Sequence, residues 1–183
     1  MPLIYNYGQK GISIPRVVSR IYKYASLTEV PSVEVQVKKK TIKTTINSRK
    51  RIDDAWAYLK DNCAKRAKCN DYFANLSRKM TLSDIMNNVT FTVHCLVPKE
   101  GHKDDELPLA NSSGQDFALS IWAFLDTTTG AQNTTPALAA TILHELAHYA
   151  GATTNRADKN SLQAENALMH CGLKQYHNPE SKG

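Results

Sequence analysis

Residues 135–151 read TPALAATILHELAHYAG, and this stretch decides the predicted fold. Thr135 can cap a helix, and Pro136 fits its first turn, where the missing amide hydrogen has no partner to lose. No helix breaker follows until Gly151, which suits a left-handed C-terminal cap. The stretch therefore predicts one uninterrupted helix that ends at Gly151.

The predicted helix contains the motif His144-Glu145-Leu146-Ala147-His148. Its two imidazoles are one turn apart and project from one face, at the spacing of two nitrogen ligands on a single Zn²⁺. Glu145 is placed to reach a water on that metal and is the candidate general base. The flanking residues carry no charge, which indicates a buried helix. The alternative is a core helix whose histidines have only structural partners.

The segment TILHELAHYA at 141–150 resembles the extended signature of zincin metallopeptidases. The resemblance covers this helix and, more loosely, the helix predicted after it. It implies a zincin-like α+β fold, in which a small mixed or antiparallel sheet packs on the active-site helix together with further helices. It also implies a Zn²⁺ cofactor held by His144 and His148, with Glu145 as the catalytic residue.

The third metal ligand distinguishes the zincin subfamilies. In metzincins a histidine would stand where this chain has Thr154, so that class is disfavoured. Gluzincins use a glutamate on a later helix, and Glu165 follows His148 by 17 residues. The resemblance therefore implies Glu165 as the third metal ligand, whereas an aspzincin-like site would use Asp158.

The helix predicted for residues 161–171 carries Glu165. Glu165 shares a face of this helix with Leu162, Leu168 and Met169, so we expect its carboxylate to point into the interior. A buried carboxylate is costly without a cation, and Zn²⁺ would remove that cost.

Elsewhere, periodicity and capping residues predict both helices and strands. We expect a helix at 14–25, a strand or hairpin at 33–46, a helix from Asn47 or Ser48 to about Lys65, and a short helix beginning at Thr81. The apolar stripe of the helix near residue 50 would be Ile52, Ala55, Trp56, Leu59 and Cys63. Strands are expected at 89–97 and at 117–125. The second of these would be either an edge that pairs with an extended substrate or a central strand.

Length and charge favour a single domain over residues 1–183, with a basic part at 1–90 and a catalytic part at 91–183. The basic part has 17 Lys and Arg against 7 Asp and Glu, and the catalytic part has 6 against 10. The basic residues are not interleaved with aromatic ones, so a nucleic-acid partner is not expected. No apolar stretch is long enough to span a membrane, and the first residues do not have the pattern of a Sec signal peptide.

The four cysteines, Cys63, Cys69, Cys95 and Cys171, allow three pairings if all are oxidised. None lies in a CxxC motif, which excludes thioredoxin-like redox chemistry. Cys171, like its neighbour His170, is expected to pack in the core.

These features predict a zinc-dependent metallo-endopeptidase that hydrolyses peptide bonds with a metal-activated water. Tyr176, His177 and Tyr149 are open alternatives for stabilising the oxyanion. The helix pair is also similar to metallopeptidase domains of bacterial type VI secretion effectors. That similarity implies a toxin secreted or delivered to a target cell, for example to its periplasm, with a protein or peptide substrate and an immunity protein or secretion-machine carrier as partners. The alternatives are a zinc hydrolase of peptidoglycan peptides and a non-enzymatic basic binding module.

Overall fold

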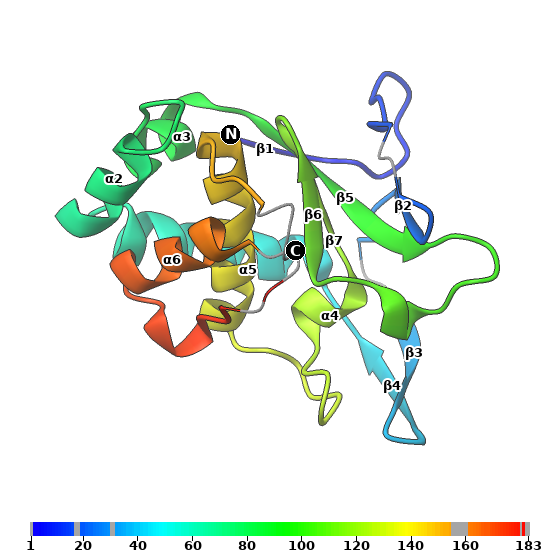
Figure 1. Ribbon diagram of the computed structural model, residues 1–183. Coiled ribbons are helices and arrows are strands. Elements are labelled where there is room, and N and C mark those ends of the chain that lie inside the picture. Colours follow the sequence, from blue (N-terminus) through cyan, green and yellow to red (C-terminus); the bar gives the residue numbers. More distant parts are fainter. Residues whose placement is uncertain (1, 17–18, 30–31, 155–160, 180, 182–183) are drawn as a thin grey trace.

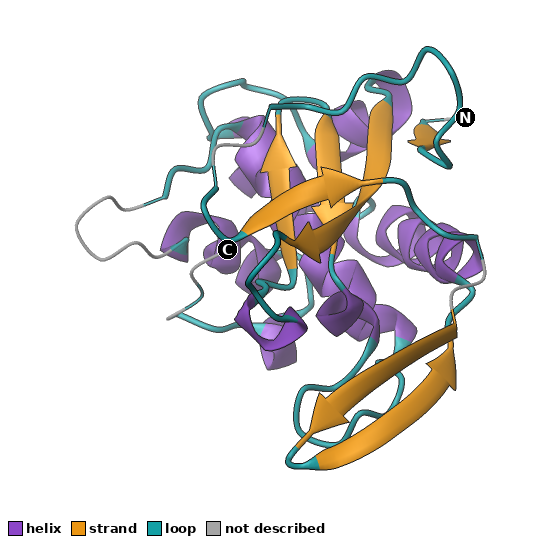
Figure 2. Ribbon diagram, turned by 90° about the vertical axis from the view of Figure 1, so that its right-hand side faces the viewer, coloured by secondary structure: helices purple, strands orange, loops and turns teal. Residues whose placement is uncertain are grey.

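The computed structural model describes residues 2–16, 19–29, 32–154, 161–179 and 181. In this part of the chain a mixed sheet stands beside a group of helices (Figure 1). Figure 2 looks onto the sheet and shows the helices behind it, so they cover one of its faces. The described fold is α+β with a small mixed sheet and six α-helices, which confirms the predicted class at this level.

The main sheet has five strands: β1 (Leu3–Tyr5), β2 (Tyr22–Ala25), β5 (Phe91–Pro98), β6 (Ala110–Ser113) and β7 (Asp116–Leu119). β5 is the centre of the sheet, with β1 and β7 parallel to it and β2 antiparallel. β6 pairs antiparallel with β7 and forms the edge of the sheet. The strand expected at 89–97 is thus confirmed as β5, shifted by two residues at its start.

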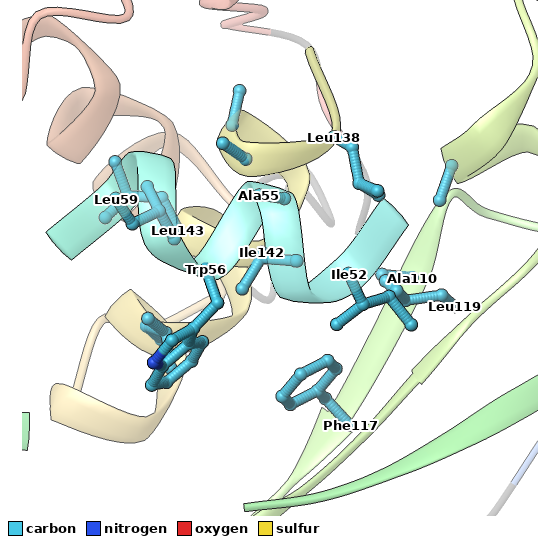
Figure 3. Close-up of a cluster of buried hydrophobic side chains, with 14 of the residues drawn as sticks. Ile52, Ala55, Trp56, Leu59, Ala110, Phe117, Leu119, Leu138, Ile142 and Leu143 are labelled. Carbon is cyan, nitrogen blue, oxygen red and sulfur yellow. The ribbon is translucent and has the colours of Figure 1, made fainter. Parts of the chain in front are cut away.

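The core lies between this sheet and two long helices, α1 (Ser48–Tyr58) and α5 (Thr135–Ala150). Figure 3 shows the apolar stripe of α1 directed at Ile142 and Leu143 of α5 and at Phe117 of the sheet. Each fully buried aliphatic side chain contributes about 1.5–3 kcal/mol, so this contact holds α5 firmly in place. The expected stripe is confirmed, and α1 continues as a π-helical turn at Leu59–Cys63.

Helix α5 has the ends that its sequence predicts. The side chain of Thr134, one residue before the expected cap, accepts a hydrogen bond from the Ala137 amide. Gly151 ends the helix in the left-handed region with φ 111°. A Cβ at this position would lie 1.9 Å from Oγ of Ser77, so only glycine allows the 75–79 loop to approach so closely.

Four shorter helices complete the helical layer: α2 (Ala67–Ala74), α3 (Leu82–Asn88), α4 (Ile121–Phe124) and α6 (Leu162–His170). Short 3₁₀ turns lie at Asp104–Glu106 and Lys174–Tyr176. Thr81 forms a capping box at the start of α3, as its position predicted. A disulfide between Cys69 and Cys171 joins α2 to the residue after α6, while Cys63 and Cys95 are free thiols.

The hairpin alternative for residues 33–46 is confirmed. Strands β3 (Ser32–Val37) and β4 (Lys40–Thr45) pair with each other and form a separate two-stranded sheet, seen projecting in Figure 2. Its inner face is anchored by Val35 and Val37, which are buried. The connecting residues Lys38 and Lys39 both have positive φ, as a tight two-residue turn requires.

The helix expected at 14–25 is wrong. Residues 12–16 have no regular structure and Tyr22–Ala25 form strand β2, while Val17 and Val18 lie outside the described residues. The stretch Tyr22-Lys23-Tyr24 alternates with period two, and the free edge of β5 offers backbone partners from Cys95 to Pro98. Pairing with a distant strand therefore outweighs the local helical pattern.

The strand expected at 117–125 is correct only in its first part. β7 ends at Leu119, and Ser120 caps the short helix α4 by accepting a hydrogen bond from the Trp122 amide. β7 lies between β5 and β6, so the prediction of a central strand is confirmed and the prediction of an edge strand is wrong.

No helix in the described part of the chain is long and apolar enough to cross a membrane.

Candidate metal centre

Helix α5 forms one wall of a cleft of about 810 Å³. The opposite side includes Ala110 of the edge strand β6 and the preceding loop, and the end of the β3 hairpin contributes Lys38. His144, Glu145, Glu165 and Tyr176 are among the lining residues. The cleft therefore exposes the HExxH helix to any molecule that enters it.

The orientation of His144 is set by α6. Nδ1 of His144 lies 2.6 Å from Oε1 of Glu165, and Oε2 of Glu165 accepts a hydrogen bond of 2.8 Å from the Asn178 amide. An ionised carboxylate can only accept, so Nδ1 carries the hydrogen of the neutral ring. The Nε2 atom of His144 is then left with its lone pair.

The orientation of His148 is set by the end of its own helix. Nδ1 of His148 lies 3.0 Å from the carbonyl oxygen of Ala152, which can only accept. The left-handed turn at Gly151 brings this carbonyl back toward the helix. His148 therefore also carries its hydrogen on Nδ1, with the lone pair on Nε2.

These two Nε2 atoms face each other at 3.1 Å. Two lone pairs at this distance repel unless a proton or a cation lies between them. Nitrogens bound to one tetrahedral zinc ion at about 2.0–2.1 Å lie about 3.3 Å apart. The pair of imidazoles thus fits two ligands of a single divalent cation, each with an outer hydrogen bond that fixes its tautomer.

Glu145 lies beside the histidine pair in the wall of the cleft and is only 3% exposed. No residue in the described part of the chain forms a hydrogen bond or an ion pair with its carboxylate. Apart from the Tyr7 hydroxyl, no fully buried side-chain oxygen or nitrogen among the described residues is without a hydrogen-bond partner, so the oxygens of Glu145 reach the interior of the cleft. Glu145 is placed as a base that acts on a molecule in the cleft.

The electrostatic environment of His144 combines opposing effects. Burial of the ring lowers its pKa and is the largest single influence, but the hydrogen bond that the ring donates to Glu165 and the charges of Glu145 and Glu165 together raise the pKa of His144. The net rise shows that negative charge dominates this part of the cleft. A site of this character favours a cation.

The position of Glu165 bears on its expected role as third metal ligand. Its carboxylate contacts His144 on the Nδ1 side, away from the nitrogen that faces His148. Within the described ranges, no three histidine, cysteine, aspartate or glutamate side chains are grouped so that they could hold one ion. The rival ligand Asp158 lies outside the described residues. Glu165 as a ligand, and zinc as the cofactor, stay predictions.

The expected surroundings of Glu165 are only half correct. Glu165 and Leu168 are buried as expected, but Leu162 and Met169 are each 43% exposed. The buried side of α6 is completed instead by Ala164 and Ala167.

The two residues that end α6 also differ from expectation. His170 is exposed and stacks on the ring of Tyr72 with centroids 4.6 Å apart, so its expected place in the core is wrong. Cys171 is buried as expected, but in the disulfide.

Of the three candidates for stabilising an oxyanion, Tyr176 alone lines the large cleft. Its hydroxyl lies 3.3 Å from Oγ1 of Thr134. Tyr149 packs its ring against Phe91 and Arg78, and His177 contacts Asn166. The geometry therefore favours Tyr176.

Some residues of the site could not be found from the sequence. The edge strand β6 has only four residues, ANSS, with no clear strand pattern. Arg78, in the loop after α2, lines a pocket together with His148, where that loop packs against Gly151. The one sequence feature that could have indicated this arrangement is Gly151, since a left-handed cap returns the chain toward His148.

Comparison of the chain with protein-family models, with curated proteins and with solved structures gave no significant match. A functional proposal for this protein therefore depends on the geometry of the site itself.

Proposed function

We propose that the protein is a zinc-dependent metallo-endopeptidase with a zincin-like fold. The observation that carries the proposal is the pair of Nε2 atoms of His144 and His148, 3.1 Å apart, with both Nδ1 atoms committed to acceptors. Each ring is oriented by an acceptor at Nδ1, and both Nε2 atoms are directed at one point where a single cation could bind them together.

A zinc ion bound by His144 and His148 would lower the pKa of a water toward 7 and polarise a carbonyl group. Glu145, next in sequence to the first ligand, accepts a proton from a water in the cleft and returns it to the leaving amine. Glu165 holds the His144 ring in the required tautomer through its hydrogen bond.

Two further parts of the cleft suit a peptide substrate. The edge strand β6 has one side without a partner strand among the described residues, and an extended peptide can pair there through its backbone. The hydroxyl of Tyr176 is available on the same cleft to donate to the oxygen of the tetrahedral intermediate.

Metal analysis of the purified full chain tests the proposal. We expect about one zinc per chain in the wild type, loss of the metal in His144→Ala, and retention in His102→Ala, which removes a histidine that does not line the cleft. Glu145→Gln should keep the metal and lose at least about 10²-fold in casein hydrolysis. Zinc that stays bound in His144→Ala, or full activity in Glu145→Gln, would contradict the proposal.

The disulfide supports an oxidising destination, such as the periplasm of a target cell. Delivery as a bacterial type VI effector, with an immunity protein, remains part of this proposal. Digestion of purified sacculi compared with digestion of casein separates a peptidoglycan substrate from a protein substrate.

A further inference from the structure

A second pocket, of about 350 Å³, lies next to His148. It is lined by Ser77, Arg78, Ser112, Gly114, His148, Tyr149 and Gly151. The large cleft and this pocket share the same two walls. Helix α5 contributes His144 to the cleft and His148 to the pocket, and β6 contributes Ala110 to the cleft and Ser112 to the pocket.

Arg78 is held in a defined position at this pocket. Its guanidinium lies 4.4 Å from the centre of the Tyr149 ring, and its amide donates to the carbonyl of Ala150 at 3.0 Å. The neighbouring Ser77 packs against Gly151 so closely that no Cβ fits between them. These contacts order the loop before any ligand binds, which reduces the entropy lost on binding.

The chemistry of the pocket is that of an anion site. Arg78 is the one lining side chain that is charged at all pH values near neutrality, and no acidic residue in the described part of the chain forms an ion pair with it. The hydroxyls of Ser77 and Ser112 add hydrogen-bond donors. A guanidinium presents its donors as a planar fork that matches the two oxygens of a carboxylate.

We propose that this pocket is a substrate subsite that binds a carboxylate group close to the scissile bond. The inference rests on the proposed peptidase function, because a peptide that pairs with β6 passes from the large cleft to the Arg78 pocket. The carboxylate is either the α-carboxylate at the substrate's C-terminus or the side chain of an aspartate or glutamate. The subsite selects peptides that carry a negative charge at this point.

Equilibrium binding to the Glu145→Gln protein, which leaves peptides intact, tests the subsite independently of turnover. The probes are matched peptides that end in a free carboxylate or an amide, and matched peptides with Glu or Gln at each position near the cleaved bond. We expect one carboxylate-containing probe to bind at least about tenfold more tightly than its neutral partner. The preferred pair identifies the source of the carboxylate.

The same comparison in variants assigns the effect to Arg78. Arg78→Gln, placed in the Glu145→Gln protein, should bring the ratio between the paired probes to about one. Arg78→Lys keeps the positive charge but loses the planar pair of guanidinium donors, so it should retain part of the preference for the carboxylate-containing probe. This variant also tests the subsite if Arg78→Gln fails to fold. Lys79→Gln removes a neighbouring cation outside the pocket and should leave the ratio unchanged.

Two results would overturn the subsite: equal binding of all paired probes to the parent protein, or a preference that survives in Arg78→Gln. Neither depends on hydrolysis. A wild-type protein that cleaves nothing but still discriminates through Arg78 would refute the proposed function and leave the carboxylate site standing.

Discussion

Glu165 of α6 makes a 2.6 Å hydrogen bond to Nδ1 of His144 on α5, so one helix sets the tautomer of a histidine on another. The other carboxylate oxygen is held by the Asn178 amide, which makes this contact a fixed part of the fold. Cation binding by His144 on α5, as proposed, would therefore depend on how α6 is docked.

Removal of this carboxylate should weaken metal binding. We expect Glu165→Ala to lower zinc affinity about 10–100-fold, since His144 loses the partner that fixes its ring. Glu165→Gln keeps an acceptor oxygen and should bind zinc more tightly than the alanine variant does. Competition with a chromophoric chelator measures both affinities. The neighbouring Asn166→Ala serves as a control, and wild-type affinity in Glu165→Ala would contradict the role of Glu165.

The hydroxyl of Tyr176 should matter for turnover and not for substrate binding. Tyr176→Phe removes one donor to the oxyanion, so kcat should fall about 10²–10³-fold with little change in KM. Tyr58→Phe is the matched control, because Tyr58 lines neither the large cleft nor the Arg78 pocket. Steady-state kinetics on a fluorogenic peptide gives both constants. A large rise in KM alone would instead indicate that Tyr176 binds the ground state of the substrate.

The disulfide should make a large contribution to stability. Cys69 and Cys171 are 102 residues apart, and a closed loop of that length corresponds to about 4–5 kcal/mol of lost entropy in the unfolded chain. Cys69→Ser/Cys171→Ser should therefore unfold at a clearly lower guanidinium concentration than the oxidised wild type. Reductant should lower the wild-type midpoint and leave that of the double variant in place. Identical unfolding midpoints of the wild type with and without reductant would show that the disulfide contributes nothing to stability.

The two free thiols should be unreactive in the folded protein. Burial raises the pKa of Cys63 and of Cys95 to about 11. At pH 8 this reduces the thiolate fraction about 100-fold relative to an ordinary thiol, so reaction with Ellman's reagent should be slow and should accelerate as the pH rises toward 11.

The same pKa shift has a consequence for stability. Because the folded pKa values of the two thiols are raised, their contribution to the free energy of unfolding is fully present below the unfolded pKa near 9. This contribution is lost as the pH rises through 11.

In denaturant without reductant, two thiols per chain should react at once with Ellman's reagent. Rapid labelling of the native protein at pH 8 would be inconsistent with this burial.

A chain of polar side chains links the residue after β1 to β5 and β7. The side-chain amide of Asn6 donates to Nδ1 of His94 at 2.9 Å, and Nε2 of His94 donates to Asp116 at 2.8 Å. His94→Leu leaves the buried Asn6 amide without its acceptor and should lower the free energy of unfolding by about 1–3 kcal/mol.

A double-mutant cycle with Asn6→Ala measures the coupling between these two side chains, which should be at least about 0.5 kcal/mol. His102→Ala, at a more exposed histidine, is the control and should have little effect. Additive effects of the Asn6 and His94 substitutions would show that the hydrogen bond is not formed in solution.

Local patterns predicted several elements correctly. Helix α5 and its glycine cap, the capping box at Thr81, the hairpin at 33–46 and the stripe of α1 all depend on residues close together in the chain. Their backbone hydrogen bonds and caps are made within each segment. The facing histidines belong to this group, because their spacing follows from the pitch of one helix.

Contacts between distant segments decided the rest. The sequence alone could not indicate that Tyr22–Ala25 would pair with β5, that ANSS would be the sheet edge, or that Cys69 would bond to Cys171. The carboxylate of Glu165 reaches His144, and Arg78 shares a pocket with His148, from other parts of the chain. Side-chain burial and strand pairing depend on which surfaces meet after folding, and a one-dimensional pattern does not contain that information.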